Sequence, residues 1–435
     1  MKNLLKASLW LLLTGITMFL MVRCGTPKGA EETTTYRVSG SYGYIDKTGK
    51  MVIEPHFDLA YPFEEGLARV VINDKYGFID KTGKTVITPQ FDYASGFVEG
   101  YSLVEMDGNY GYIDRTGKMV IDPQYDGALC FDDGLAAVLI NDKFGYIDKT
   151  GKMVIPPQFD NVYYPFKEGL AVVEIDGKYG YIDKTGKMVI SPQFDNVYYF
   201  DEGFARVEKD NKYGIIDKTG KIVIVPQFDY IYPYYEDLAL VEKDGKHGYI
   251  DKSGKIVIPP QFDDAGCFEE GLAFVKIGDK YGYIDKTGKM AIELQFDYAQ
   301  NFKTGLALVE KDDKYGYVDK SGKIVIVPQF DNAEHFDKGM AQVEKDGKWG
   351  FIDKTGKMVI EPRFKYAFEF NDEQMAFVIL EGNRFAFIDR AGNTKIEDYY
   401  WNEDDAVFSY VPCFSEGLCP IFILDEQPEI EGSHQ

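Results

Sequence analysis

The chain has 435 residues, of which 45% are hydrophobic and 15% aromatic, and its formal net charge is -23. This apolar content is ample for a packed core, which excludes an intrinsically disordered chain. A surface this acidic repels phosphate backbones, so we expect no nucleic acid among the partners.

Residues 1–23 are predicted to be an export signal or a membrane anchor. Lys2 and Lys6 precede an uncharged run from residue 7 to residue 22, which is about 24 Å of helix and suits the apolar part of an export signal. Cys24 follows this run and resembles the lipidated cysteine of the bacterial lipoprotein lipobox, although Arg23 stands where that pattern has a small residue. Lipidation at Cys24, an uncleaved anchor and ordinary cleaved secretion stay open as alternatives. Residues 24–32 are predicted to be a polar tether.

Residues 33–426 repeat one unit about eleven times, and residues 427–435 form an acidic tail. Residues 110–121 show the motif best, and its glycine recurs every 34 residues, with one interval of 35. These glycines are Gly43, Gly77, Gly111, Gly145, Gly180, Gly214, Gly248, Gly282, Gly316 and Gly350, and Ala386 takes their place in an eleventh copy. A period this regular predicts a repeat architecture for the whole array.

Each unit is predicted to be a three-stranded antiparallel meander. In one unit, residues 170–175 alternate in the manner of a strand, and Asp176-Gly177 is typical of a tight hairpin turn. Residues 179–183 form the second predicted strand, and residues 187–190 form the third, which ends before Pro192. A glycine inside a strand indicates a close approach, so we expect Gly180 to make room for an aromatic ring.

The predicted fold class is all-β, a tandem array of these meanders. We favour an open solenoid, because eleven units exceed the four to eight blades of most propellers and three strands fall short of a four-stranded blade. A closed, propeller-like ring is the alternative. The ends, Tyr36-Arg37-Val38 and residues 417–424, are expected to act as caps.

The segment Lys348-Trp349-Gly350-Phe351-Ile352-Asp353, with Pro362 and Phe364 downstream, resembles the WG-containing repeat of bacterial proteins, also called the KWG repeat. Residues 166–171 and 268–273 resemble that repeat as well. The resemblance extends over about residues 33–426 and implies a β-rich repeat protein, frequently exported. It implies no catalytic residues, since the family has no shared active site.

No enzyme motif stands out, so we expect no catalysis and no cofactor. The four histidines, at 56, 247, 335 and 434, occupy unrelated places in the unit. The aspartate after each Tyr-Gly-Tyr-Ile segment recurs along the array, as at Asp183, and could hold calcium or cap the following turn. Turn capping is the prediction, because a lysine follows almost every one of these aspartates.

Four cysteines lie in the array. Cys130, Cys267 and Cys413 each precede the phenylalanine of the same loop, and Cys419 follows six residues after Cys413. Buried free thiols are expected, and a local bridge between Cys413 and Cys419 is the alternative.

The loop after each Phe-Asp pair differs most between units and is rich in tyrosine in the middle of the array. Variation in one loop of a uniform repeat indicates an edge that faces a partner. The candidate binding residues are Tyr163, Tyr164, Tyr198, Tyr199, Tyr230, Tyr232 and Tyr235. That these tyrosines merely fill the seam between units stays open.

The expected function is therefore an exported, envelope-attached scaffold that binds a protein at the Tyr-rich loop edge and the membrane through its N-terminus. A cell-wall or surface glycan is the alternative ligand, because tyrosine rings stack while neighbouring polar groups take hydrogen bonds. A periplasmic hydrolase with a carboxylate pair in one divergent unit is the third possibility.

Overall fold

A computed structural model describes residues 40–400 and 414–424. The predicted export signal, Cys24, the tether, the predicted cap strand at Tyr36-Arg37-Val38 and the acidic tail lie outside the described residues. In the part that is described, no helix combines the length and apolarity needed to cross a membrane.

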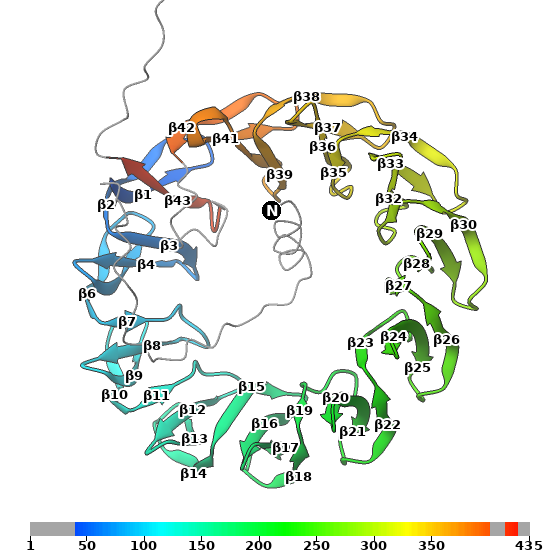
Figure 1. Ribbon diagram of the computed structural model, residues 1–435. Coiled ribbons are helices and arrows are strands. Elements are labelled where there is room, and N and C mark those ends of the chain that lie inside the picture. Colours follow the sequence, from blue (N-terminus) through cyan, green and yellow to red (C-terminus); the bar gives the residue numbers. More distant parts are fainter. Residues whose placement is uncertain (1–39, 401–413, 425–435) are drawn as a thin grey trace, which may run out of the picture. The chain divides into compact units, whose positions relative to one another are not determined.

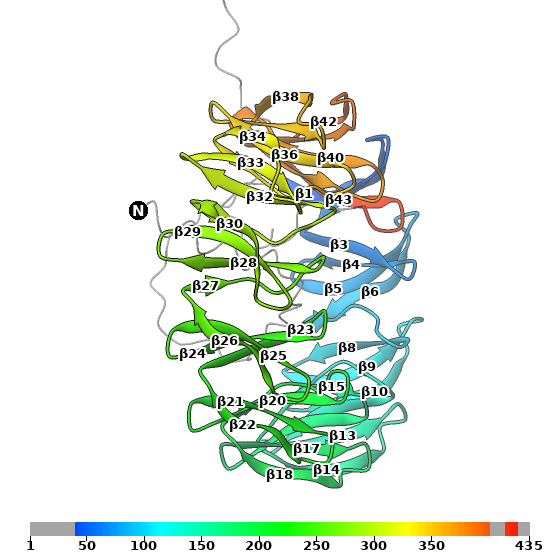
Figure 2. The ribbon, with the colours of Figure 1, turned by 90° about the vertical axis from the view of Figure 1, so that its right-hand side faces the viewer.

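The described residues form eleven antiparallel sheets that follow one another around a ring (Figure 1). Ten sheets have four strands and one has three. We call each sheet a blade. Within each four-stranded blade the strands run in chain order, the first nearest the centre of the ring and the last on its outer side (Figure 1). Figure 2 shows the blades from β38 to β18 following one another without a break.

Blades 1 to 5 comprise residues 59–228. Blade 1 is β3 (Leu59–Glu64), β4 (Leu67–Ile72), β5 (Lys75–Asp80) and β6 (Thr85–Phe91). Blade 2 is β7 (Tyr93–Ala94), β8 (Tyr101–Met106), β9 (Asn109–Asp114) and β10 (Met119–Tyr125). Blade 3 is β11 (Gly127–Ala128), β12 (Leu135–Ile140), β13 (Lys143–Asp148) and β14 (Met153–Phe159). Blade 4 is β15 (Asn161–Lys167), β16 (Leu170–Ile175), β17 (Lys178–Asp183) and β18 (Met188–Phe194). Blade 5 is β19 (Asn196–Val197), β20 (Phe204–Lys209), β21 (Lys212–Asp217) and β22 (Ile222–Phe228).

The remaining blades continue the series. Blade 6 is β23 (Tyr230–Tyr235), β24 (Leu238–Lys243), β25 (Lys246–Asp251) and β26 (Ile256–Phe262). Blade 7 is β27 (Asp264–Ala265), β28 (Leu272–Ile277), β29 (Lys280–Asp285) and β30 (Met290–Phe296). Blade 8 is β31 (Tyr298–Ala299), β32 (Leu306–Lys311), β33 (Lys314–Asp319) and β34 (Ile324–Phe330). Blade 9 is β35 (Asn332–Ala333), β36 (Met340–Lys345), β37 (Lys348–Asp353) and β38 (Met358–Phe364). Blade 10 is β39 (Tyr366–Phe370), β40 (Met375–Ile379), the 3-10 turn η1 (Glu381–Asn383), β41 (Arg384–Asp389) and β42 (Thr394–Tyr400). Blade 11 is β1 (Gly40–Asp46), β2 (Met51–Phe57) and β43 (Leu418–Leu424).

The all-β repeat prediction is confirmed, but the strand count of a unit was wrong by one. The three predicted strands are present, and the loop after Phe-Asp adds a short innermost strand such as β7, which pairs Tyr93 with Glu105 and Ala94 with Val104. In six blades this innermost strand has only two residues, too few for a periodicity that a sequence could reveal. With the fourth strand, each of these units is a complete propeller blade.

The glycine of the motif lies under a bulge of the outermost strand. In blade 4, Tyr181 pairs with Ile190 and Tyr179 with Phe194, so β18 carries two extra residues between these pairs. A methyl group on Gly180 would lie 2.7 Å from the nitrogen of Pro192. Gly180 therefore makes room for backbone of its own blade, and the expectation of an aromatic ring was wrong.

The hydrophobic core lies between blades. One cluster joins blades 4 and 5 and contains Tyr181, Ile190, Val197, Phe200 and Val207, all at most 5% exposed. The Tyr181 hydroxyl donates to the carbonyl of Tyr198 in the next blade at 2.7 Å. Equivalent tyrosines of other blades donate in the same way, at Tyr44, Tyr112, Tyr249, Tyr283 and Tyr317. Stability therefore depends on the stacking of neighbours, as expected of a repeat array.

Polar contacts of one type also join each blade to the next. At the junction of blades 4 and 5, the carboxylate of Glu168, which lies just before β16, accepts a hydrogen bond from the Gly203 amide at 3.1 Å. The same carboxylate forms an ion pair with Lys218 of blade 5 at 2.9 Å. Ion pairs of this type are Arg115 with Glu65, Lys149 with Glu99, Lys184 with Asp133, Lys252 with Glu202, Lys286 with Glu236, Lys320 with Glu270, Lys47 with Glu373 and Lys81 with Glu416. Lys354 and Arg390 donate to the carbonyls of Thr304 and Lys338 instead. One such contact therefore exists at every junction of the ring.

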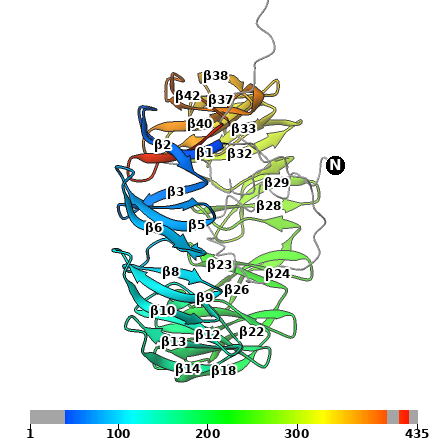
Figure 3. The same cartoon turned by 90° about the vertical axis from the view of Figure 1, so that its left-hand side faces the viewer.

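The two ends of the chain complete a single blade. β43 pairs with β1 over its whole length, from Gly40 opposite Leu424 to Asp46 opposite Leu418. Figure 3 shows the red strand β43 beside the blue strand β1. The favoured open solenoid was therefore wrong, and the closed ring is confirmed. Residues 417–424 supply the strand that blade 11 needs, so they do not act as a cap.

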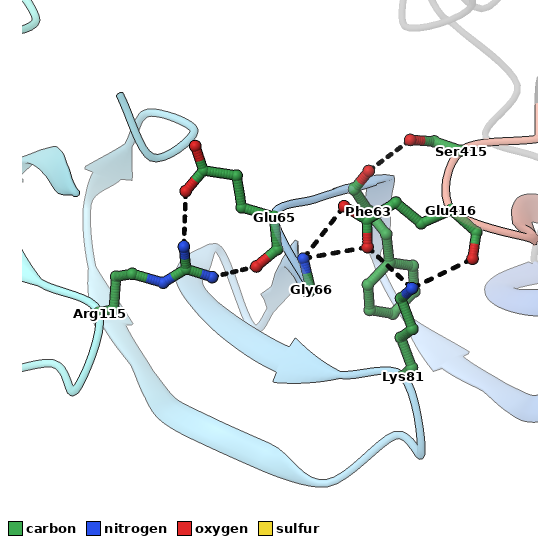
Figure 4. A network of polar contacts seen from close by, with 7 residues as sticks. All are labelled: Phe63, Glu65, Gly66, Lys81, Arg115, Ser415 and Glu416. Atoms are coloured by element: carbon green, nitrogen blue, oxygen red, sulfur yellow. Dashed lines mark hydrogen bonds and ion pairs between the residues drawn. The ribbon is translucent and has the colours of Figure 1, made fainter. Parts of the chain in front are cut away.

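The polar contacts across this junction match those elsewhere in the ring. Glu416 accepts from the amide of Gly66 at 3.0 Å and pairs with Lys81 at 2.9 Å (Figure 4). Ser415 donates its hydroxyl to the carbonyl of Phe63 (Figure 4). Glu416 thus makes the same two contacts with blade 1 that Glu168 makes with blade 5. The blade that contains both chain ends is therefore joined to blade 1 in the same way as consecutive repeats are joined to each other.

Because the carboxylates of Glu168 and Glu416 join neighbouring blades, we expect acid to destabilise the ring. Hydrogen bonds from Lys218 and Lys81 lower the pKa of Glu168 and Glu416 below the usual value. A carboxyl with a lowered folded-state pKa stabilises the fold above the unfolded pKa, and this contribution is lost as the pH falls through that range.

We expect the urea midpoint to be unchanged between pH 7 and pH 6 and to fall below about pH 4.5. Unfolding curves followed by circular dichroism at each pH check this. A midpoint that stays constant down to pH 3 would contradict it.

Candidate functional site

The repeated aspartates form turn caps. Asp183 Oδ1 accepts from the Thr185 hydroxyl at 2.6 Å, from the Thr185 amide at 2.9 Å and from the Lys187 amide at 3.1 Å. The Thr185 hydrogen bonds lower the pKa of Asp183. The same bonds recur at Asp46, Asp80, Asp114, Asp148, Asp217, Asp251, Asp285, Asp319 and Asp353. Turn chemistry therefore accounts for this ladder, and the described residues hold no cluster of three or more metal-binding side chains.

The aspartate of each Phe-Asp pair also has a structural role. Asp195 accepts from the amide of Asp210 at 2.7 Å and pairs with Lys178 of the preceding blade. It thereby fixes the hairpin of its own blade and joins two blades.

The cysteines and histidines are separated from one another. Cys130 and Cys267 are half-buried free thiols, and burial raises the pKa of Cys267 to about 12, so neither is activated as a nucleophile. Cys413 lies outside the described residues, so a bridge between Cys413 and Cys419 stays an open alternative. Burial, together with Lys303, lowers the pKa of His335 to about 4, and the ring is therefore neutral at physiological pH.

The seven predicted tyrosines belong to three adjacent blades. Tyr163 and Tyr164 lie in β15 of blade 4, and nothing is described of the Tyr164 side chain. Tyr198 and Tyr199 follow β19 of blade 5. The other three, Tyr230, Tyr232 and Tyr235, lie in β23 of blade 6. The seven tyrosines therefore belong to corresponding loops of neighbouring blades, and their role in binding stays a prediction.

Tyr163 and Tyr230 pack against neighbouring side chains. The Tyr163 hydroxyl accepts from Asn161 at 2.7 Å, and its ring lies 5.4 Å from that of Tyr179. The ring of Tyr230 packs edge-on against Tyr213 at 5.0 Å. For these two tyrosines the seam-filling alternative fits the contacts.

Among the six of these tyrosines whose side chains are described, Tyr199 and Tyr235 are the most exposed, at 41% and 45%. Lys167 places its ammonium 3.8 Å from the centre of the Tyr199 ring and 3.6 Å from Asp201. The Lys167 ammonium therefore lies over the Tyr199 ring, and Tyr235 keeps almost half of its surface exposed.

A cavity of about 110 Å³ lies between blades 5 and 6. Its walls include Tyr198, Tyr199 and Arg206 from blade 5 and Tyr232 and Tyr234 from blade 6. Pockets for whole small molecules enclose roughly 300 to 1,000 Å³, so this cavity can hold one ring or side chain and not a nucleotide-sized cofactor.

Arg206 organises this cavity. Its guanidinium lies 4.0 Å from the centre of the Tyr198 ring and donates Nη1 to the carbonyl of Ile231 at 2.7 Å. Burial, together with the Tyr230 hydroxyl, raises the pKa of Tyr198, so the phenol stays protonated at neutral pH. Arg206 was not among the predicted binding residues. The sequence does set it apart, because most other units have an apolar residue at the third position of this strand.

The ring of eleven blades and its tyrosine-lined edge define a closed β-propeller with a candidate binding site between blades 5 and 6. Ten segments match the WG containing repeat: 42–76, 76–110, 110–144, 144–179, 179–213, 213–246, 248–281, 281–315, 315–349 and 349–383. The chain belongs to the WG-containing repeat family, as its resemblance implied.

Three solved structures show limited similarity to this chain. They are the computationally designed Ika8 protein (12% identity, 61% of this chain and 93% of that chain, TM-score 0.30), a eukaryotic initiation factor (13%, 66% and 92%, 0.36) and BamB from Moraxella catarrhalis (11%, 66% and 98%, 0.31). TM-scores of this size carry no argument about the present chain. No curated protein matches it.

Proposed function

We propose that the chain is a non-enzymatic binding scaffold that holds a partner at the loop edge of blades 4 to 6. The observation that carries this proposal is the cavity between blades 5 and 6, which Tyr199 and Tyr232 line together with Arg206. Such a site on variable loops fits recognition, because binding residues are usually carried by variable loops on a fixed scaffold.

The partner in this proposal is a protein of the cell envelope. The uncharged run of residues 7–22 and Cys24 support export and attachment to a membrane. Tyrosine and arginine are the residue types that dominate binding energy at protein interfaces. A chain of net charge -23 is steered toward partners that are neutral or basic.

Three substitutions on the loop edge test this proposal. In the natively expressed, affinity-tagged chain, Tyr199→Pro, Tyr232→Ser and Tyr235→Ser together are expected to reduce the recovery of a co-purifying protein by roughly tenfold or more. Quantitative mass spectrometry of the purified complexes measures this recovery.

The control changes Val225→Ser and Val327→Ser, which are 64% and 65% exposed on outer strands β22 and β34. This variant is expected to retain the partner. Equal recovery from the loop variant and the wild type, or equal loss from both variants, would contradict the role of the loop edge.

A further inference from the structure

Two junctions of the ring hold an arginine between neighbouring blades. Arg206 occupies the third position of β20 and lies 4.0 Å from the centre of the Tyr198 ring, which stands opposite it in its own blade. In the next blade it donates to the carbonyl of Ile231 at 2.7 Å and lies 5.7 Å from the centre of the Tyr230 ring. The same contacts join Arg69 of β4 with Tyr61, Ala94 and Tyr93. The fold therefore accepts a guanidinium between two blades at this position.

The junction of blades 9 and 10 has the same position without an arginine. Gln342 is the third residue of β36, and Glu334 stands opposite it, because the Glu334 amide donates to the Gln342 carbonyl at 3.0 Å. On the other side of the junction, Tyr366 and Ala367 begin β39, as the ring and the carbonyl that meet Arg206 begin β23. This junction thus has the same neighbours in the next blade, with a carboxyl and an amide in place of the tyrosine and the arginine.

The side chains of Glu334 and Gln342 lack partners. Gln342 is only 6% exposed. Within the described part of the chain, its side-chain amide and the Glu334 carboxyl form no hydrogen bond and no ion pair. A buried polar group without a hydrogen bond destabilises the fold and therefore indicates a missing partner. Because the two side chains stand opposite each other on one face of the sheet, a single ligand can reach both.

The surroundings of Glu334 are acidic and aromatic. Burial, together with Glu334 and Glu344, raises the pKa of Tyr366 to about 12, so both carboxyls lie close to this ring. Burial and Glu369 raise the pKa of Glu334. Lys338 lies near Glu369, but its ammonium already forms an ion pair and a hydrogen bond to a backbone carbonyl. A cation that entered here would therefore be favoured, and an anion would be repelled.

We infer that the junction of blades 9 and 10 binds the guanidinium of an arginine side chain that belongs to a basic partner protein. The Glu334 carboxylate and the Gln342 amide oxygen accept its N–H groups, and Tyr366 provides an aromatic ring beside them. A guanidinium suits these groups because it offers several donors in one plane and packs against rings. The net charge of -23 steers basic partners toward the chain. This site is distinct from the loop edge of blades 4 to 6, so either can fail without the other.

Calorimetric titration of the full-length chain with two tripeptides tests the inference. Both peptides are acetylated and amidated and carry one residue between two glycines. That residue is arginine in one peptide and citrulline, its neutral isostere, in the other. At about 0.15 M salt, where distant charges are screened, we expect the arginine peptide to bind at least roughly tenfold more tightly than the citrulline peptide.

Glu334→Gln is expected to weaken binding of the arginine peptide by roughly tenfold. The matched control is Glu54→Gln, which removes the same charge from an exposed position of the outer strand β2 and should leave the affinity within about twofold. Equal effects of the two variants, equal affinity for the two peptides, or absence of binding at millimolar concentration would overturn the inference.

A cation supplied by the chain itself gives a second test. Gln342→Arg places a guanidinium opposite Glu334 and is expected to abolish peptide binding and to raise the thermal unfolding midpoint by roughly 2 °C. Its control is Leu308→Arg, at the same position of β32, where Gln300 and no carboxyl stands opposite. An unpaired charge buried there should lower the midpoint. A midpoint that Gln342→Arg lowers as strongly as Leu308→Arg does would show that the junction does not accept a guanidinium.

Discussion

A chain that ends at residue 413 is expected to lose its cooperative fold. This truncation removes β43, whose side chains Leu418, Cys419 and Ile421 are at most 7% exposed. It also removes the whole ladder to β1 and the contact between Glu416 and Lys81. Burial of large apolar side chains stabilises by about 2 kcal/mol each, so the loss is at least about 5 kcal/mol, comparable to the total stability of many domains.

Thermal unfolding followed by circular dichroism measures this loss. The control ends at residue 424 and keeps every described residue of β43. It is expected to unfold at the wild-type temperature. An unchanged midpoint in the chain that ends at 413 would mean that the blades stack as an open array and that β43 is dispensable.

The second large effect is expected from Gly180→Ala. The added methyl group would lie 2.7 Å from the Pro192 nitrogen, which belongs to backbone and cannot turn away as a flexible side chain would. Overpacking of this kind costs typically 1 to 3 kcal/mol, and we expect about 3 kcal/mol here because the obstacle is a bulged strand. Urea unfolding of the variant and the wild type measures the difference.

Blade 10 supplies the control for this substitution. Ala386 replaces the glycine there, and β42 pairs Phe385 with Tyr399 and Phe387 with Ile396. The bulge of β42 is one residue shorter than that of β18, whose pairs are Tyr179 with Phe194 and Tyr181 with Ile190. Ala386→Gly is therefore expected to change stability by less than about 1 kcal/mol. Equal effects at both positions would contradict the role assigned to the bulge.

The repeating unit could be predicted well because its signals are local. Asp176 and Gly177 have the positive φ of a tight hairpin, at 52° and 72°, as their residue types indicate. Asp183 caps its turn through bonds within four residues of itself. Alternation and turn chemistry operate over distances of this kind, so one unit suffices to recognise them.

Closure of the ring could not be predicted from one unit. It depends on the small rotation between successive blades, which is set by packing of side chains such as Tyr181 against Phe200 and leaves no local pattern. One signal was present at the ends. Residues 417–424 have the pattern of the strand that precedes the hairpin in each unit, but no hairpin follows them. The unit that begins near Tyr42 has the hairpin partner β1 but not the strand before it, and β43 pairs with β1 in its place. Comparison of the two ends would have favoured a shared blade.

The tyrosine-rich loops of blades 4 to 6 could be noticed in the sequence, since tyrosine is conspicuous in composition, and their role in binding stays a prediction. The cavity lined by residues of blades 5 and 6 depends on the stacking of these blades, as does the contact of Arg206 with Ile231. Contacts between residues of different units depend on how the blades are placed in the ring. The sequence of one loop does not determine that placement.

Zero-length carbodiimide cross-linking with peptide mapping tests the closed ring most directly. The reagent joins a lysine to a carboxylate only when they are in contact. Lys218 with Glu168 is the internal control, since their blades are consecutive in either architecture. A closed ring predicts two further products in the monomer, Lys81 with Glu416 and Lys47 with Glu373, whose partners come from opposite ends of the chain and lie 2.9 Å and 2.8 Å apart. Recovery of the control product without either of these two would contradict the closed ring.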